Sequence, residues 1–186
     1  MEHILQNLEE LNIWLKKNNK FIELHLIGGF AIYLHGINLG RETEDIDNIN
    51  EITDQSIIDK IHEIGEKHST EKWFDLGAPT LSLPRGYKIR LKAGSHLSNI
   101  KIYLLSREDL ISLKIAAYYS RRERGIIRDI LDLKILCPSL KEIDIGINFT
   151  YESVQNEGHL QERFLGELKE ELNLFHEELK NELSSK

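Results

Sequence analysis

Apolar positions in the first hundred residues follow two different periods, and these predict helices and strands in alternation. Residues 3–17 carry Ile, Leu and Trp at helical spacing, so we expect an amphipathic helix there. The stretch FIELHLI over residues 21–27 predicts a strand that Gly28 and Gly29 end. The further elements expected are, in chain order, a short helix over 30–35, a strand over 45–49, a helix from an N-cap at Thr53 to about His68, and strands over 87–92 and 100–105.

Beyond the last of these strands, the pattern favours helices alone. Ser106 stands at the N-cap position of one helix, with Asp109 placed as in a capping box, and this helix is expected to run to about Tyr119. A second helix is expected over residues 125–136, where Pro138 stops it because proline cannot continue a helix.

The C-terminal segment reads as a Glu-rich helix with one apolar seam. The seam residues recur at alternating intervals of three and four, and they are Leu165, Leu168, Leu172, Phe175 and Leu179. We expect this seam to pack on the body of the protein, and a homodimer contact through the C-terminal helix is the alternative.

This order of elements predicts an α/β (α+β) fold, a mixed β-sheet flanked by helices with a C-terminal helical portion. We divide the chain into an α/β core over residues 1–105 and a helical portion over residues 106–186. The helical portion is expected to pack on the core and to end in the acidic amphipathic helix. A length of 186 residues is ample for burying a hydrophobic core.

Charge and cysteine content narrow the class of protein. The chain has 24 Lys and Arg against 31 Asp and Glu, so its overall balance lacks a strongly basic nucleic-acid footprint. A local basic cluster exists at Arg121, Arg122, Arg124 and Arg128, and it is either a contact for RNA phosphates or a solvated helix end. A single cysteine excludes an internal disulfide framework and a thiol-rich zinc site.

Location follows from what the sequence lacks. No uncharged apolar run approaches the roughly 18 residues that a membrane helix needs. The N-terminus has neither the basic start nor the apolar block of a secretory signal. We therefore expect a cytoplasmic protein with no membrane partner.

The most informative block combines a Gly-Gly turn with two acidic residues. A strand that ends in Gly28-Gly29 and leads into a helix exposes backbone N–H groups that can cradle a phosphate. Asp45 and Asp47 lie two residues apart on a predicted strand, so their side chains share one face. Adjacent carboxylates repel unless a cation lies between them, and Mg²⁺ prefers such oxygen ligands together with substrate phosphates. The combination predicts metal-assisted phosphoryl or nucleotidyl transfer, whereas an Asp-x-Asp pair alone would indicate only a surface strand edge.

This block resembles the first motif of the polymerase-β-type nucleotidyltransferase superfamily: Gly-Gly or Gly-Ser, a short helix, then Asp-x-Asp. The particular sequence of this block is similar to the AbiEii-like branch and its uncharacterised bacterial relatives, where Gly-Gly, His-Gly, Arg-x-Thr and Asp-Ile-Asp occur in this order. Later segments, LSREDLISLK over 105–114 and RDILDL over 128–133, resemble that branch's Lys-bearing helix and the helix that follows it. The resemblance covers roughly residues 20–140.

The resemblance implies a role for each matching residue. Gly28 and Gly29 would bind the nucleotide phosphates together with Arg41 and Thr43. Asp45 and Asp47 would be the catalytic metal ligands, holding Mg²⁺ or Mn²⁺.

A second set of roles comes from the later motif. Lys114 would be a further catalytic residue that approaches the phosphates as a point charge, although a partly buried lysine reaching to water is the alternative. Asp129 would orient Lys114 or Arg121. Equally, Asp129 and Asp132 could only cap and pair within a helical bundle.

One departure from the superfamily concerns its third carboxylate, which usually lies on a later strand. Neither of the two later strands predicted here, over 87–92 and 100–105, contains an acidic residue. Three explanations stay open: Asp75 or Asp129 supplies the group, a basic residue contacts phosphate there instead, or the protein has lost turnover.

The histidines show no spacing typical of a metal site. His62 and His68 are six residues apart on one predicted helix, and His25 lies inside the first strand. We interpret the histidines as structural or surface residues, with His35 the nearest to the predicted pocket.

Two classes of function follow. The first is a Mg²⁺-dependent nucleotidyltransferase that moves an NMP group from an NTP to a hydroxyl of RNA, such as a tRNA end, or of a protein. In the resembled branch, such enzymes often act as toxins with a cognate antitoxin or in phage defence. The second is a catalytically inactive nucleotide-binding or partner-binding module with the same fold, which would bind NTP but form no product.

Overall fold

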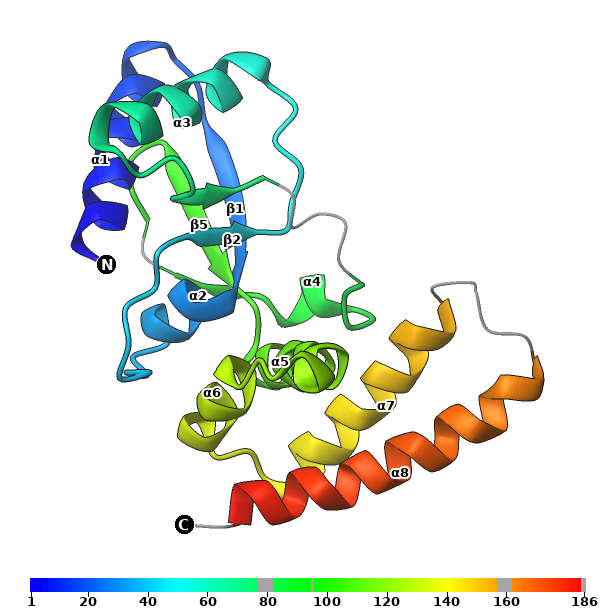
Figure 1. Cartoon of the computed structure of the whole chain (residues 1–186). Coiled ribbons are helices and arrows are strands. Elements are labelled where there is room, and N and C mark those ends of the chain that lie inside the picture. Colours follow the sequence, from blue (N-terminus) through cyan, green and yellow to red (C-terminus); the bar gives the residue numbers. More distant parts are fainter. Residues whose placement is uncertain (77–81, 95, 157–161, 185–186) are drawn as a thin grey trace. The chain divides into compact units, whose positions relative to one another are not determined.

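The computed structural model describes residues 1–76, 82–94, 96–156 and 162–184 (Figure 1). It divides into two compact units: the first comprises Met1–Leu81 and Gly86–Ser106, and the second comprises Ser82–Arg85 and Arg107–Lys186. Across the described ranges, no helix is long and apolar enough to cross a membrane.

The first unit contains a mixed five-stranded sheet in the order β3-β2-β1-β5-β4. Its strands are β1 (Ile22–Ile27), β2 (Ile46–Asn48), β3 (Phe74–Asp75), β4 (Lys92–Ala93) and β5 (Ile100–Leu104). The central strand β1 is parallel to β5 and antiparallel to β2, while β2 is parallel to β3. This confirms the predicted mixed sheet flanked by helices.

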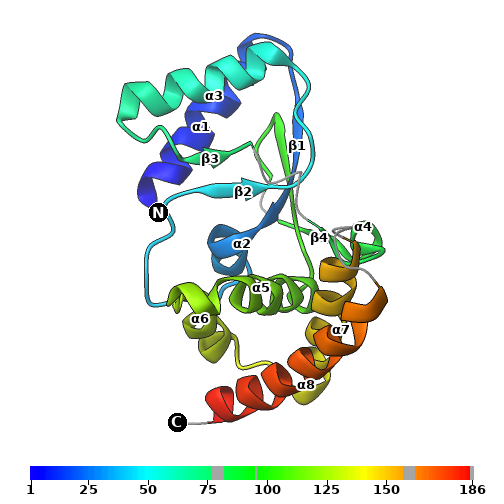
Figure 2. The same ribbon diagram turned by 45° about the vertical axis from the view of Figure 1, so that its right-hand side comes forward.

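One face of the sheet is apolar and belongs to the core. Leu24 and Leu26 of β1 pair with Ile102 and Leu104 of β5, and these side chains are buried together with Ile100, which lies two residues before Ile102 on the same face. Helices α1 (Glu2–Lys17) and α3 (Gln55–His68) lie side by side and bury their own apolar stripes (Figures 1 and 2). The opposite face of the sheet carries other side chains, including those of the acidic residues described below.

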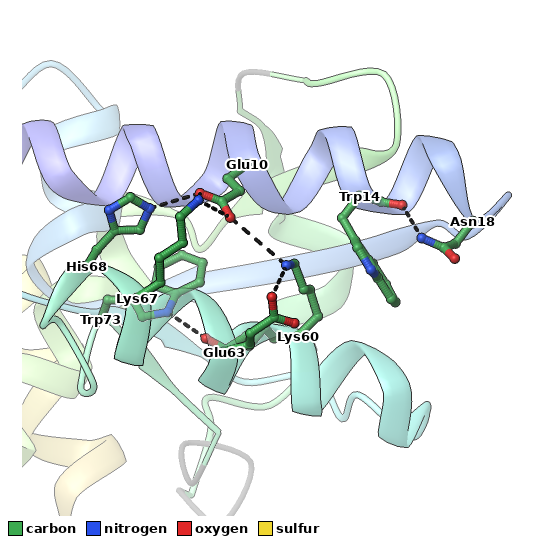
Figure 3. Close-up of polar contacts among 9 residues, drawn as sticks. Glu10, Trp14, Asn18, Lys60, Glu63, Lys67, His68 and Trp73 are labelled. Carbon is green, nitrogen blue, oxygen red and sulfur yellow. Dashed lines mark hydrogen bonds and ion pairs between the residues drawn. The ribbon is translucent and has the colours of Figure 1, made fainter.

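Polar contacts fasten α3 to α1 (Figure 3). The Glu10 carboxylate accepts from Lys67 Nζ at 2.8 Å and from His68 Nε2 at 2.8 Å. These hydrogen bonds lower the pKa of Glu10, with His68 making the larger contribution. Trp73 is buried in the core and donates from Nε1 to the carbonyl of Ile61 at 3.0 Å.

Two local expectations in this unit were wrong. The segment 87–92 is not a strand: residues Tyr87–Arg90 form the helical turn α4, and only Lys92–Ala93 joins the sheet. Gly86 enters that turn at φ +69°, and Ile89, whose place in the apolar alternation suggested a strand, is 88% exposed. The N-cap of α3 is Asp54 rather than Thr53, because the Asp54 side chain accepts from the Ser56 backbone N–H at 3.0 Å.

The second unit is helical in its described residues. Its α-helices are α5 (Arg107–Arg121), α6 (Arg128–Leu136), α7 (Leu140–Asn156) and α8 (Glu162–Ser184), with a short 3₁₀ turn at Arg122–Arg124. Helix α6 begins three residues later than predicted, because the 3₁₀ turn ends on Gly125 in a left-handed conformation. Helix α7 packs closely on α5, since a Cβ at Gly146 would lie 2.5 Å from Ile115 Cδ1.

The seam of α8 packs within this unit. Leu172, Phe175 and Leu179 are buried, and the Phe175 ring contacts Tyr118 and Tyr119 of α5 at centroid distances of 5.8 and 5.2 Å. The side chains of Leu165 and Leu168 lie outside the described residues. A homodimer contact through this helix stays a prediction.

Candidate functional site

The Gly-Gly turn and Asp47 are in direct contact. Strand β1 ends at Ile27 and helix α2 (Gly28–Leu34) follows at once, with Gly28 at φ +69°. A Cβ built on Gly28 would lie 1.7 Å from Asp47 Oδ2, so the carboxylate occupies the space that any side chain would need. Glycine is therefore required here twice, for its backbone conformation and for the close approach of Asp47.

Thr43 and Arg41 reach the next glycine. A Cβ on Gly29 would lie 2.8 Å from Thr43 Oγ1 and 3.6 Å from an Arg41 guanidinium nitrogen. Thr43 is buried, and its hydroxyl has no hydrogen-bond partner. A buried polar group without a partner costs about 1–3 kcal/mol, so this hydroxyl is suited to a ligand. The structure thus brings four of the predicted nucleotide-binding residues together: Gly28, Gly29, Arg41 and Thr43.

Asp45 and Asp47 flank the buried Ile46. Asp47 lies in β2, and Asp45 immediately precedes the strand. Ile46 and Asn48 are buried, whereas both aspartates are half-buried. Alternation within β2 places Asp47 on the face opposite to Ile46, whereas Asp45 lies just outside the strand that was predicted to include it.

Asp75 lies on the strand next to Asp47. Strand β3 is parallel to β2, and the register pairs Asp47 with Asp75. Paired residues of adjacent strands point to the same face, so Asp75 adds a third carboxylate beside the first two. Sequence reasoning named Asp75 as one candidate for this group but predicted no strand there, because β3 is only two residues long.

The donor set of this face suits a hard cation. Asp45, Asp47 and Asp75 offer carboxylate oxygens, the ligands that Mg²⁺ and Mn²⁺ take. The turn at Gly28, which lacks a Cβ and suits a phosphate, lies in contact with Asp47. Within the described residues, however, no three His, Cys, Asp or Glu side chains are already gathered as a metal site. All three residues fit the metal by ligand type, and Asp47 and Asp75 also share one face of the sheet.

Lys114 lies in the second unit, in a cluster of paired charges. Its Nζ is 2.9 Å from Asp129 Oδ1 and 2.8 Å from Asp132 Oδ2, and both carboxylates are buried. Arg121 donates to the other oxygen of Asp129 at 3.1 Å. Asp129 thus contacts both cations named for it, and the Asp132 contact also agrees with a structural pairing. Because an ammonium has three donors, Lys114 keeps one beyond these two ion pairs.

The four arginines of the basic cluster have different surroundings. Arg122 stacks on Tyr119 at 4.1 Å, donates to Glu171 at 2.7 Å and thereby connects α5 to α8. Burial, together with the hydrogen bond that the Tyr119 hydroxyl donates to the Glu171 carboxylate, raises the pKa of Tyr119 to about 12. Arg124 and Arg128 are exposed, so the RNA-contact hypothesis now rests on fewer residues than the sequence suggested.

His35 donates from Nε2 to the carbonyl of Leu105 at 2.8 Å and joins the end of α2 to the end of β5. The histidine whose environment sequence reasoning missed is His25. His25 is buried in β1, with Nε2 2.9 Å from Glu23 Oε1. Its Nδ1 is buried and has no hydrogen-bond partner. Only strand register could have drawn attention to it, since its spacing to other histidines carries no signal.

Comparison with known families supplies the last observation. No curated protein and no solved structure matches the chain. A family model described as "Nucleotidyltransferase of unknown function (DUF6036)" matches residues 2–161. The AbiEii-like branch stays a prediction, whereas the nucleotidyltransferase resemblance is confirmed at this broader level. The match spans most of the sequence, and the chain therefore belongs to this nucleotidyltransferase family of unknown function.

Proposed function

We propose that the protein transfers an NMP group from an NTP to an acceptor hydroxyl in a Mg²⁺-dependent reaction. The observation that carries this proposal is the contact between Asp47 and the Gly28 turn. It joins a carboxylate suited to a metal with backbone N–H groups suited to a phosphate, which are the two requirements of nucleotidyl transfer.

Phosphate binding is assigned to the start of α2. Gly28 and Gly29 open the helix, where backbone N–H groups have no partner within the helix and favour an anion. The unpartnered hydroxyl of Thr43 and the guanidinium of Arg41 approach Gly29 from the side. Together, these groups would orient the triphosphate for transfer.

The carboxylate face is assigned to the metal. Asp45 and Asp47 would hold Mg²⁺ or Mn²⁺, with Asp75 as the third carboxylate by its register with Asp47. When bound, the metal would neutralise phosphate charge and polarise the α-phosphorus toward the acceptor. Asp129 is less suited to this task, because its two oxygens already accept from Lys114 and Arg121.

The resemblance implies a phosphate-contacting role for Lys114, and we include it in this proposal. The ion pairs with Asp129 and Asp132 would restrict the rotamers of Lys114 and leave one donor for a phosphate oxygen. Arg121 would support the same arrangement through Asp129.

The test is label transfer from each α-labelled NTP in the presence of Mg²⁺, total cellular RNA and the protein itself. An Asp45→Ala/Asp47→Ala double variant should lose transfer, while Asp59→Ala, an exposed aspartate on α3, should retain it. Label on RNA or on protein identifies the acceptor class. The absence of transfer by wild-type protein under all four NTPs would contradict the proposal.

An inactive nucleotide-binding or partner-binding module is the second candidate. The observation in its favour is that the described side chains form no preassembled three-ligand metal site. Such a module would bind NTP with Mg²⁺ in an Asp47-dependent manner and release no pyrophosphate. A toxin role, with a cognate antitoxin as partner, is a further proposal that would require growth arrest on expression of wild-type protein but not of the double variant.

A further inference from the structure

His25 lies on the same face of the sheet as the proposed metal ligands. It precedes Ile27 by two residues in β1, and Ile27 is the register partner of Asp47 in β2. Alternate residues of a strand share a face, so His25, Ile27 and Asp47 belong to one face. Diagonal neighbours across such a pair lie about 7–8 Å apart, within reach of a common small substrate.

The protonation of the ring follows from its contacts. His25 Nε2 is 2.9 Å from Glu23 Oε1, and a carboxylate can only accept, so Nε2 carries the proton. In the neutral ring, Nδ1 then holds a lone pair. This atom is buried and has no hydrogen-bond partner. The two nitrogens lie on different edges of the ring, and Nδ1 therefore faces away from Glu23.

Within the described parts of the chain, charged and titratable groups approach His25 from several elements. Glu23 contacts it from the same strand, Tyr103 packs edge-on from β5 at 5.7 Å, and Tyr87 packs edge-on from α4 at 6.2 Å. His96 lies beyond Tyr103, with 6.2 Å between those rings. Asp47 is the diagonal neighbour on β2. Burial raises the pKa of Tyr87, so this phenol stays neutral beside the imidazole.

We propose that His25 is the proton acceptor for the attacking hydroxyl, and that Glu23 is its positioning residue; this inference rests on the proposed function. The acceptor oxygen forms a bond to the α-phosphorus while the bond from that phosphorus to the β-bridging oxygen breaks and pyrophosphate leaves. The proton of the acceptor hydroxyl passes to His25 Nδ1 and from there to solvent. The Glu23 carboxylate stabilises the imidazolium formed, as a carboxylate behind a catalytic histidine does.

The chemistry of the face supports a base at this position. An unpartnered buried acceptor is costly, which a purely structural residue would avoid and a substrate hydroxyl would relieve. Asp45, Asp47 and Asp75 would be neutralised by a cation, which makes them poor bases. An imidazole loses its proton at about pH 6–7, where general-base catalysis is efficient at neutral pH.

The experiment measures pyrophosphate release from a mixture of the four NTPs with Mg²⁺ and total cellular RNA, between pH 5.5 and 9. This readout follows the same bond whichever hydroxyl attacks. His25→Gln and His25→Asn should lower the rate by about 10²–10⁴-fold and abolish the rise of rate through the imidazole range. His96→Gln, an exposed imidazole of the same ring cluster, is the matched control and should change neither.

Glu23→Gln tests the positioning role separately. Removing the negative charge withdraws the stabilisation of the imidazolium formed during the reaction, so the rate of pyrophosphate release should fall. Ring ¹⁵N spectra of His25 give a readout independent of activity: wild-type protein should show the Nε2–H tautomer, and Glu23→Gln a mixture of both tautomers.

The outcomes separate the two proposals. Pyrophosphate release by wild-type protein, with a pH profile unchanged in folded His25→Gln and His25→Asn, would overturn the role of His25 and leave the proposed function standing. No release by wild-type protein would overturn the proposed function and this role with it. If the wild-type ring carries its proton on Nδ1, that result alone would exclude Nδ1 as the base.

Discussion

The proposed site of the α/β unit and the Lys114 cluster of the helical unit differ in how their buried polar groups are satisfied. On the site side of the α/β unit, Thr43 Oγ1 and His25 Nδ1 are buried with no hydrogen-bond partner. In the helical unit, the buried carboxylates of Asp129 and Asp132 both contact Lys114 within 3 Å. Unmet hydrogen-bonding capacity beside a turn suited to a phosphate favours a ligand there, whereas the buried carboxylates beside Lys114 already have charged partners.

Two roles are open for Lys114, one in folding and one in phosphate binding. Its ion pairs would be needed for folding even without a substrate, because buried carboxylates require a cation. They would equally hold an ammonium in place for phosphate binding. Stability and activity measurements on the same variants separate these two contributions.

The largest expected effect on stability comes from breaking the closed charge cluster. Lys114→Met leaves Asp129 and Asp132 buried without their shared cation, and we expect a loss of about 3–5 kcal/mol in the free energy of unfolding. Urea unfolding measures it. Lys134→Met is the matched control, since Lys134 pairs with Glu182 at 3.0 Å on the surface and should cost less than about 1 kcal/mol. Equal losses in both variants would contradict a special role for the buried cluster.

The Gly28 turn should be the most sensitive backbone position of the α/β unit. Gly28→Ala combines a left-handed backbone, which costs about 1–2 kcal/mol, with displacement of the Asp47 carboxylate. Gly36→Ala has φ +80° but no atom within 4 Å of the new Cβ, so it reports the backbone cost alone. We expect Gly28→Ala to have the lower melting temperature and to lose nucleotide binding. Identical behaviour of the two variants would show that the close approach of Asp47 is unimportant.

Thr43→Val sharpens the distinction between the units. It replaces an unpartnered buried hydroxyl with a methyl group of similar shape, so stability should be unchanged or rise by about 1 kcal/mol. Affinity for NTP should fall, because the hydroxyl is assigned to the nucleotide. Calorimetry with a non-hydrolysable NTP measures affinity, and thermal unfolding measures stability. A clear loss of stability would show that the hydroxyl has a structural partner after all.

The smallest effect concerns pH and the contact between α1 and α3. The pKa of Glu10 is lowered by His68 and Lys67, so the folded state favours the ionised carboxylate. This stabilisation is fully present above about pH 4.5 and is lost as the pH falls through the lower folded pKa. Glu10→Gln should therefore flatten the decline of stability in acid, by less than about 1 kcal/mol. Glu63→Gln is the control, because it removes an exposed carboxylate that pairs with Lys60. It should leave the decline of stability in acid unchanged, as measured by urea unfolding at pH 3.5 and 7.

Sequence periodicity predicted the longer elements well and the short ones poorly. Helix α1 and strands β1 and β5 were confirmed within a residue or so of their expected bounds, because their apolar patterns extend over many residues. Helix α7 was not singled out, since IDIGINF over residues 143–149 alternates like a strand although it is helical. Strand β3 has two residues, too few for any period to register.

The sequence by itself determined the chemistry available: a Gly-Gly turn, an Asp-x-Asp pair, and a Lys helix followed by an Arg-Asp-x-x-Asp helix. Tertiary structure alone decided which of these residues meet. Asp75 stands beside Asp47 because β3 pairs with β2, and His25 shares their face because β1 pairs with β2 in a particular register. Register between strands depends on packing of the whole sheet rather than on local propensity, so a single sequence cannot fix it.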